Sequence, residues 1–138
     1  MVRTISGYAA PILVAPILIW VLRPLFARFF RESAHLFLDV HCEPRQAQQV
    51  GSTMARINVV LFALIWMGVF TCIVFELKIA VSAAIVIAGL LIGFWLTTGI
   101  ARHHLNIGGW NSVPVGLVSF AGGNLPMLLL IPVVLLVN

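Results

Sequence analysis

Four long stretches of this chain contain no Asp, Glu, Lys, Arg or His, and the charged residues lie almost entirely between them. The stretches cover residues 4–22, 57–75, 79–101 and 113–137. A helix needs about 20 consecutive apolar residues to cross the hydrocarbon core of a bilayer, and each stretch is close to that length or longer. Membrane β-strands are shorter and alternate in polarity. The pattern therefore predicts an all-α integral membrane protein with four transmembrane helices.

A different pattern follows the first stretch. Between residues 25 and 41, Phe26 and Phe30 recur at helical spacing, while Arg28 and Glu32 lie on the opposite side. A helix with an apolar face opposite a charged face is typical of segments that lie in the membrane interface. We therefore expect an interfacial amphipathic helix on the cytoplasmic side over residues 25–41, directly after the first span, either as a separate element or as a continuation of the first helix.

Glycine and asparagine mark positions inside the spans where helices could pack closely or line a path. Gly89 and Gly93 have the GxxxG spacing that permits close helix–helix approach. Gly-Gly-Asn-Leu-Pro interrupts the fourth stretch and disfavours a continuous helix, so we expect one kinked helix or two half-helices. The candidates for helix packing or pore lining are Asn58, Gly89, Gly93, Gly122, Gly123, Asn124 and Pro126.

Composition and charge place the whole chain in a membrane. Of its 138 residues, 62% are hydrophobic and 9% are charged, whereas a soluble domain is about 25% charged. Six of the eight Lys and Arg residues lie within residues 23–56 or at Arg102, so the positive-inside rule places both termini on the non-cytoplasmic side. We expect a single multi-pass membrane domain, residues 1–138, in a bacterial inner (plasma) membrane, with no nucleic-acid partner.

Side chains that could carry chemistry lie outside the apolar stretches. Nitrogen, oxygen and sulfur ligands that suit a transition metal occur close together, but their spacing matches no metal signature, and we expect no bound metal. These weak metal candidates are His35, Asp39, His41 and Cys42. Basic side chains beside the spans can bind lipid phosphates or other anions. The candidates for lipid-headgroup or anion binding are Arg28, Arg31, Arg102, His103 and His104.

The pattern of charges favours packing over chemistry. No apolar stretch carries an ionisable residue of the kind that marks proton or ion pathways, and no nucleophile–base set is visible, so we expect neither an enzyme nor a cofactor. The favoured interpretation is a small non-enzymatic integral membrane subunit, in contact with the lipid bilayer, that packs with itself as a homo-oligomer or with other, larger membrane subunits in an assembly or transport-type role. One alternative is a homo-oligomeric pore or channel lined by the broken fourth helix. A second is a quinone- or haem-associated redox subunit that uses Arg102, His103 and His104.

Overall fold

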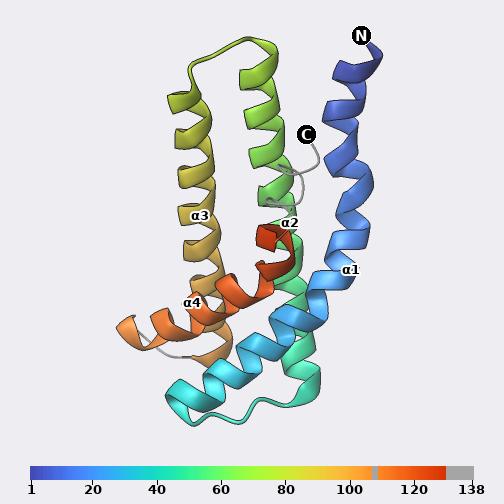
Figure 1. Cartoon of the computed structure of the whole chain (residues 1–138). Coiled ribbons are helices and arrows are strands. Elements are labelled where there is room, and N and C mark those ends of the chain that lie inside the picture. Colours follow the sequence, from blue (N-terminus) through green and yellow to red (C-terminus); the bar gives the residue numbers. More distant parts are fainter. Residues whose placement is uncertain (107–108, 130–138) are drawn as a thin grey trace.

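The computed structural model describes residues 1–106 and 109–129, and within these ranges it is helical and contains no strand. A short loop joins the first two long helices, and a tight turn joins the second and third (Figure 1). The helices are α1 (Val2–Leu38), α2 (Pro44–Val74), α3 (Ile79–Leu105), the 3-10 turn η1 (Gly109–Asn111) and α4 (Ser112–Gly123).

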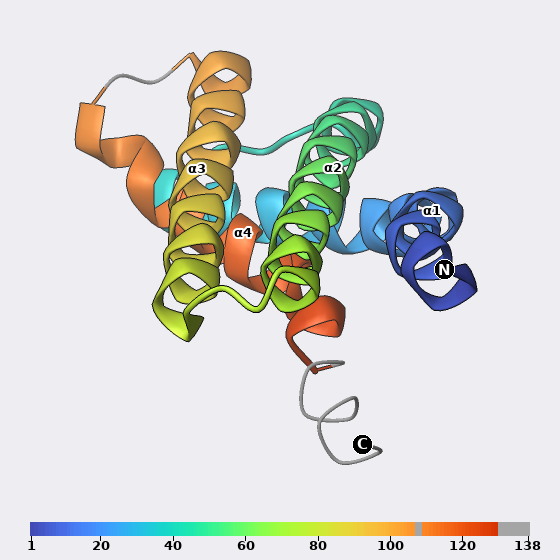
Figure 2. The ribbon, with the colours of Figure 1, turned by 90° about the horizontal axis from the view of Figure 1, so that it is seen from above.

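Three of these helices are long and apolar enough to cross a bilayer, namely α1, α2 and α3. Viewed along their length they stand in a row, with α2 in the middle (Figure 2). The chain is therefore an all-helical, multi-pass membrane protein. By contrast, α4 has 12 residues and is about 18 Å long, which is too short to cross a hydrocarbon core of about 30 Å.

The expected first span and the expected interfacial helix are parts of one helix. Residues 4–22 and most of 25–41 belong to α1, which continues through Pro24 and ends at Leu38. Proline removes a backbone donor and bends a helix, and α1 turns obliquely in its second half (Figure 1). The apolar face predicted for the membrane surface carries the fully buried Phe26 and Phe30, which belong to the protein core.

The second and fourth stretches also differ from their expected limits. The helix expected over residues 57–75 begins at Pro44, because proline suits the first turn of a helix and the polar residues that follow continue it. In the fourth stretch, α4 ends at Gly123, Asn124 forms a turn, and residues 125–129 are helical again. The interruption expected between residues 122 and 126 is therefore present. The remainder of the expected span, residues 130–137, lies outside the described residues.

The core lies at one end of the row, where the second half of α1 packs on α2 and α4, and α4 packs on α3 (Figure 1). We call this the Arg-rich end, because it holds Arg23, Arg28, Arg31, Arg45 and Arg102. From α1, Leu22 and Phe26 are fully buried there, and from α2 so are Val50 and Met54. Elsewhere the apolar surfaces of α1, α2 and α3 are largely exposed, as expected of helices that face lipid.

Glycine allows α1 and α2 to approach closely at the Arg-rich end. A Cβ atom added to Gly51 of α2 would lie 2.6 Å from the backbone nitrogen of Ala27 and 2.8 Å from its Cα atom. Because these are backbone atoms, a side-chain rotation cannot relieve the overlap. At the opposite end the same two helices are joined by polar contacts: Tyr8 and Thr71 share a hydrogen bond of 2.7 Å, and Trp66 Nε1 donates to the Gly7 carbonyl.

We expect Gly51→Ala to destabilise the fold by about 1–3 kcal/mol, because the extra methyl group forces α1 away from α2. The matched control is Gly99→Ala in α3, where an added Cβ meets no atom within 4 Å. Alanine favours a helix over glycine, so the control should melt no lower than the wild type. Thermal unfolding in detergent measures both, and equal melting temperatures for the two variants would contradict the packing.

Candidate functional site

A network of hydrogen-bonded, buried polar side chains joins α2, α3 and the residue that follows α4. Asn58 Nδ2 donates to the Met54 carbonyl (2.9 Å) and to Thr97 Oγ1 (3.0 Å), and Asn124 Nδ2 donates to Asn58 Oδ1 (3.2 Å). All three linking side chains are buried. The two asparagines proposed for packing or pore lining therefore lie together, and within a single chain each contacts the other.

The candidate glycines lie beside this network or beside the core, and each faces a side chain of the same molecule. Gly89 lies against Ile65, and Gly93 lies against Phe120 and Asn58. The GxxxG pair of α3 is thus used for contacts within the chain. Gly122 and Gly123 lie against the rings of Phe29 and Phe26, which come from the second half of α1, and Pro126 is half-buried.

Three buried oxygen atoms in the same region have no hydrogen-bond partner among the described residues. They are Thr98 Oγ1 in α3, Ser119 Oγ in α4 and Asn124 Oδ1. Gly116 of α4 lies directly on the Thr98 hydroxyl, a close approach at which a Cα–H group can contribute a weak hydrogen bond. The contact of α3 with α4 thus combines small residues with polar groups, as is common between membrane helices.

We expect Asn58→Ala to lower the stability by about 1–2 kcal/mol, because it removes the bonds to Thr97 and Asn124 and leaves their polar groups buried. Thr53→Ala, on an exposed position of the same helix where the hydroxyl bonds only the Gln49 carbonyl, is the control and should change it by less than about 0.5 kcal/mol. Chemical unfolding in mixed micelles compares the two. If both variants lose the same free energy of unfolding, the buried network contributes no more to stability than an exposed hydroxyl group does.

A basic groove of about 990 Å³ runs between the second half of α1, the loop after it and the start of α2. Its charged lining within the described residues consists of Arg23, Arg28, Arg31 and Glu32, and His35 and His41 also line it. Three guanidinium groups against one carboxylate give the groove a positive potential. The groove brings together two of the sequence-predicted anion ligands, Arg28 and Arg31.

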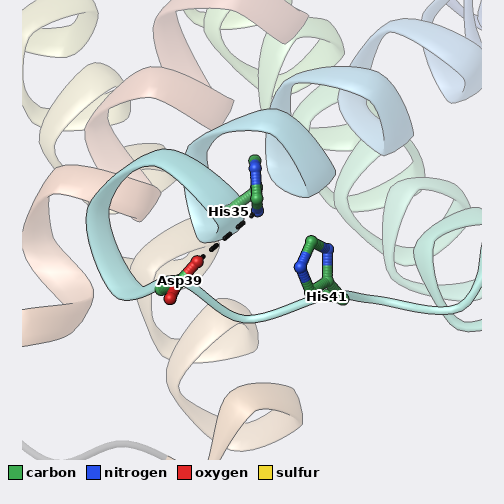
Figure 3. Close-up of side chains that lie close together, drawn as sticks. All are labelled: His35, Asp39 and His41. Atoms are coloured by element: carbon green, nitrogen blue, oxygen red, sulfur yellow. Dashed lines mark ion pairs between the residues drawn. The ribbon is translucent and has the colours of Figure 1, made fainter.

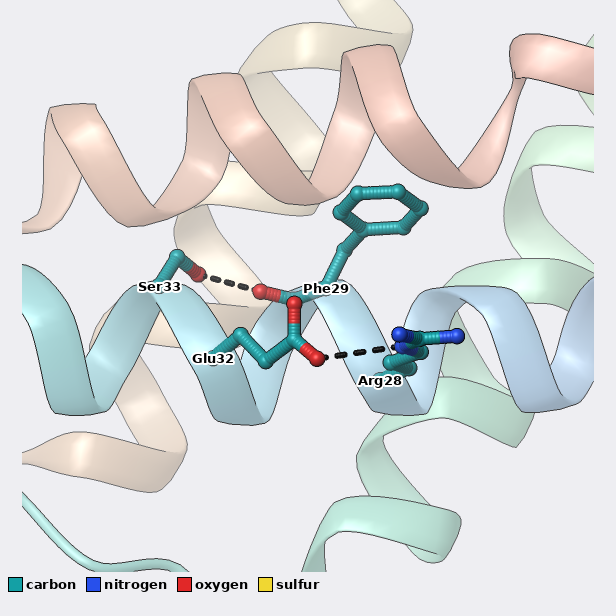
Figure 4. Close-up of polar contacts among 4 residues, drawn as sticks. All are labelled: Arg28, Phe29, Glu32 and Ser33. Atoms are coloured by element: carbon teal, nitrogen blue, oxygen red, sulfur yellow. Dashed lines mark hydrogen bonds and ion pairs between the residues drawn. The ribbon is translucent and has the colours of Figure 1, made fainter.

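Only one of the three arginines is paired. Arg28 Nε lies 3.0 Å from Glu32 Oε1 one turn along α1 (Figure 4). Both side chains are more than half exposed, and such surface pairs contribute little. Among the described residues, neither Arg23 nor Arg31 forms an ion pair. Their guanidinium groups are therefore available to an anion. The sequence pattern does not single out Arg23 as an anion ligand, although Arg23 begins the same arginine-bearing segment that contains Arg28 and Arg31.

The opposite face of the same helix points into the protein. Figure 4 shows the Phe29 ring directed towards the neighbouring helix and away from the Arg28–Glu32 pair. Ser33 Oγ donates to the Phe29 carbonyl at 2.6 Å, which satisfies a hydroxyl on this buried side. The amphipathic pattern thus separates a face that packs on α4 from a face that lines the basic groove.

The four weak metal candidates separate into two kinds. His35, Asp39 and His41 are exposed, and their possible ligand atoms all lie within 4.8 Å of one another (Figure 3). Cys42 is buried in the core and belongs to no such group among the described residues. Burial raises the pKa of the Cys42 thiol, and the positive charge of Arg31 partly opposes that shift. The thiol is therefore held in its neutral form, which is a poor metal ligand.

Arg102, His103 and His104 lie at the end of α3, apart from the basic groove. They line a second, smaller hollow of about 420 Å³, together with Trp95. Arg102 Nε donates to Ser112 Oγ (3.4 Å), and the two imidazole rings lie edge to face with their centroids 5.5 Å apart. The sequence-predicted anion candidates thus form two separate groups at one end of the molecule.

Comparison of the chain with protein-family models, with curated protein sequences and with solved structures gives no match.

Proposed function

We propose that this chain is a small non-enzymatic integral membrane subunit that acts by binding, and that its basic groove holds the phosphate groups of anionic lipids. The observation that carries the proposal is the groove itself. Three arginines and one glutamate supply its charged lining within the described residues, and two of the arginines have no ion pair there. Guanidinium groups match the geometry of phosphate oxygens better than any other side chain.

The position of the groove supports a lipid ligand. It begins where α1 leaves its long uncharged segment, at Trp20 and Arg23. The Trp20 side chain is 78% exposed, and exposed tryptophan beside basic residues is typical of the boundary between the hydrocarbon core and the headgroups. At this boundary the groove would contact lipid phosphate groups, while the apolar faces of the helices would contact acyl chains.

The remaining contacts support a role in assembly. The buried asparagines and the GxxxG glycines are engaged within the chain, so they brace a scaffold whose outer apolar faces stay open to lipid or to other membrane subunits. A pore would require Asn58 and Asn124 to face a path instead of each other. In the proposed orientation, the Arg-rich end faces the cytoplasm of a bacterial cell and the N-terminus faces the other side.

We expect the double variant Arg23→Gln with Arg31→Gln to lose preferential binding of phosphatidylglycerol over phosphatidylcholine. Each arginine near an anionic surface contributes about 1 kcal/mol, so the preference should fall by about 2 kcal/mol. Native mass spectrometry of the detergent-solubilised protein with added lipid measures it. The control is Arg3→Gln with Lys78→Gln, which removes the same charge from the opposite end.

The control variant should keep the preference of the wild type. If both double variants lose it equally, net charge and not the groove determines lipid binding. If inorganic phosphate binds the groove as tightly as the lipid does, the proposed lipid ligand is wrong.

A further inference from the structure

The last turn of α1 folds back on itself at Asp39. This residue has φ 53° and ψ 34°, the left-handed conformation that usually belongs to glycine at a helix end. Its N–H group donates to the His35 carbonyl (3.1 Å), and the Val40 N–H group donates to the Ala34 carbonyl (3.3 Å). These bonds close the helix and reverse the chain, so that His41 returns to the side of His35.

The reversal gathers three ligand side chains on the solvent side. The imidazole rings of His35 and His41 lie with their centroids 4.5 Å apart and their planes inclined at 34°. Asp39 Oδ1 lies 4.0 Å from His35 Nδ1. Figure 3 shows the carboxylate and the His35 ring facing each other, with His41 on the adjoining loop. All three residues are exposed, so an ion can reach them from solution.

The loop that carries His41 is held from both sides. Val40 is half-buried and packs against the core, and Cys42 on the other side is 7% exposed and belongs to that core. With its two neighbours fixed, His41 has little freedom to move away from His35. The three ligands are therefore arranged before any ion arrives, which reduces the entropy lost on binding.

We propose that His35, Asp39 and His41 form a surface site for a divalent transition metal ion of the Zn²⁺ type. Two imidazole nitrogens and one carboxylate oxygen are a ligand set that zinc accepts, with water in a fourth position. Ligand atoms around one zinc ion lie about 3.4 Å apart. The ligand atoms lie within 4.8 Å of one another, so binding of one ion requires the side chains to rotate until these distances shorten.

Calorimetric titration of the full chain with ZnCl₂ tests the site. The protein is prepared without a polyhistidine tag, in detergent and in phosphate-free buffer. We expect one saturable site. His35→Ala and His41→Ala should each lower its zinc affinity at least about tenfold, because even the loss of a residue that only hydrogen-bonds to a metal ligand lowers the affinity by about that factor. The matched controls are His103→Ala and His104→Ala, which alter the other exposed histidine pair and should leave the affinity unchanged within about twofold.

Asp39→Gly separates the ligand role from the structural role. Glycine adopts the left-handed conformation freely, so the metal-free variant should melt no lower than the wild type, while its zinc affinity should fall. The proposal is overturned if the wild type takes up no zinc, if the variants at residues 103 and 104 lose binding while those at residues 35 and 41 keep it, or if Asp39→Gly binds zinc as tightly as the wild type.

Discussion

Glycines bring the second half of α1 into direct contact with its neighbours, and the Arg-rich end depends on that contact. Gly51 of α2 admits the backbone of Ala27, and Gly122 and Gly123 of α4 admit the rings of Phe29 and Phe26. Between helices in lipid, the hydrophobic effect gives little net attraction, so close van der Waals packing carries much of the association. Small residues are what make such packing possible here. The basic groove exists because this packing fixes one face of α1 and leaves the other open.

The buried amide network complements this packing on the other side of the core. Asn58 bonds to Thr97 on α3 and to Asn124 at the end of α4, so one side chain of α2 connects both neighbours. An amide in an apolar environment is costly unless it is bonded. Its directional bonds therefore favour one arrangement of α2, α3 and α4 over others with similar apolar contacts. The helices carry no charged residues in their apolar segments, but a few neutral polar groups still determine how the helices are arranged.

Much of the fold follows from the distribution of charge, since uncharged runs of sufficient length must be helices in a bilayer. Uncharged runs predict the three long apolar helices, and the sequence Gly-Gly-Asn-Leu-Pro predicts the interruption near Asn124. The surroundings of α1 cannot be predicted in this way, because an apolar helix face has the same sequence pattern whether it contacts lipid or protein. The pattern therefore predicts a membrane-surface position for Phe26 and Phe30, although both belong to the protein core. The first helix continues through Arg23 and Pro24, because a membrane helix tolerates proline when its neighbours pack around it.

The sequence indicates which residue types could bind a metal or an anion, but it does not show which of these residues lie together in the structure. The proximity of His35 to Asp39 follows from helical spacing, whereas the return of His41 depends on the left-handed conformation of Asp39, which sequence patterns indicate chiefly for glycine. Cys42 was grouped with them by sequence position, and only the packing shows that its thiol belongs to the core. Likewise, the separation of Arg28 and Arg31 from Arg102 depends on the packing of α1 against α2 and α4. Tertiary contacts, rather than local propensity, determine these differences.

The central claim is that the second half of α1 is docked on α4 inside the protein and does not lie free on the membrane surface. Oxidative crosslinking in native membranes tests it directly, in a protein carrying Cys42→Ser and Cys72→Ser. The pair Phe29→Cys and Gly122→Cys should form an intramolecular disulfide rapidly, because a Cβ atom at residue 122 would lie against the first ring atoms of Phe29. The pair Phe29→Cys and Gly99→Cys should not. Equal crosslinking of the two pairs, or none in the first, would contradict the docked arrangement.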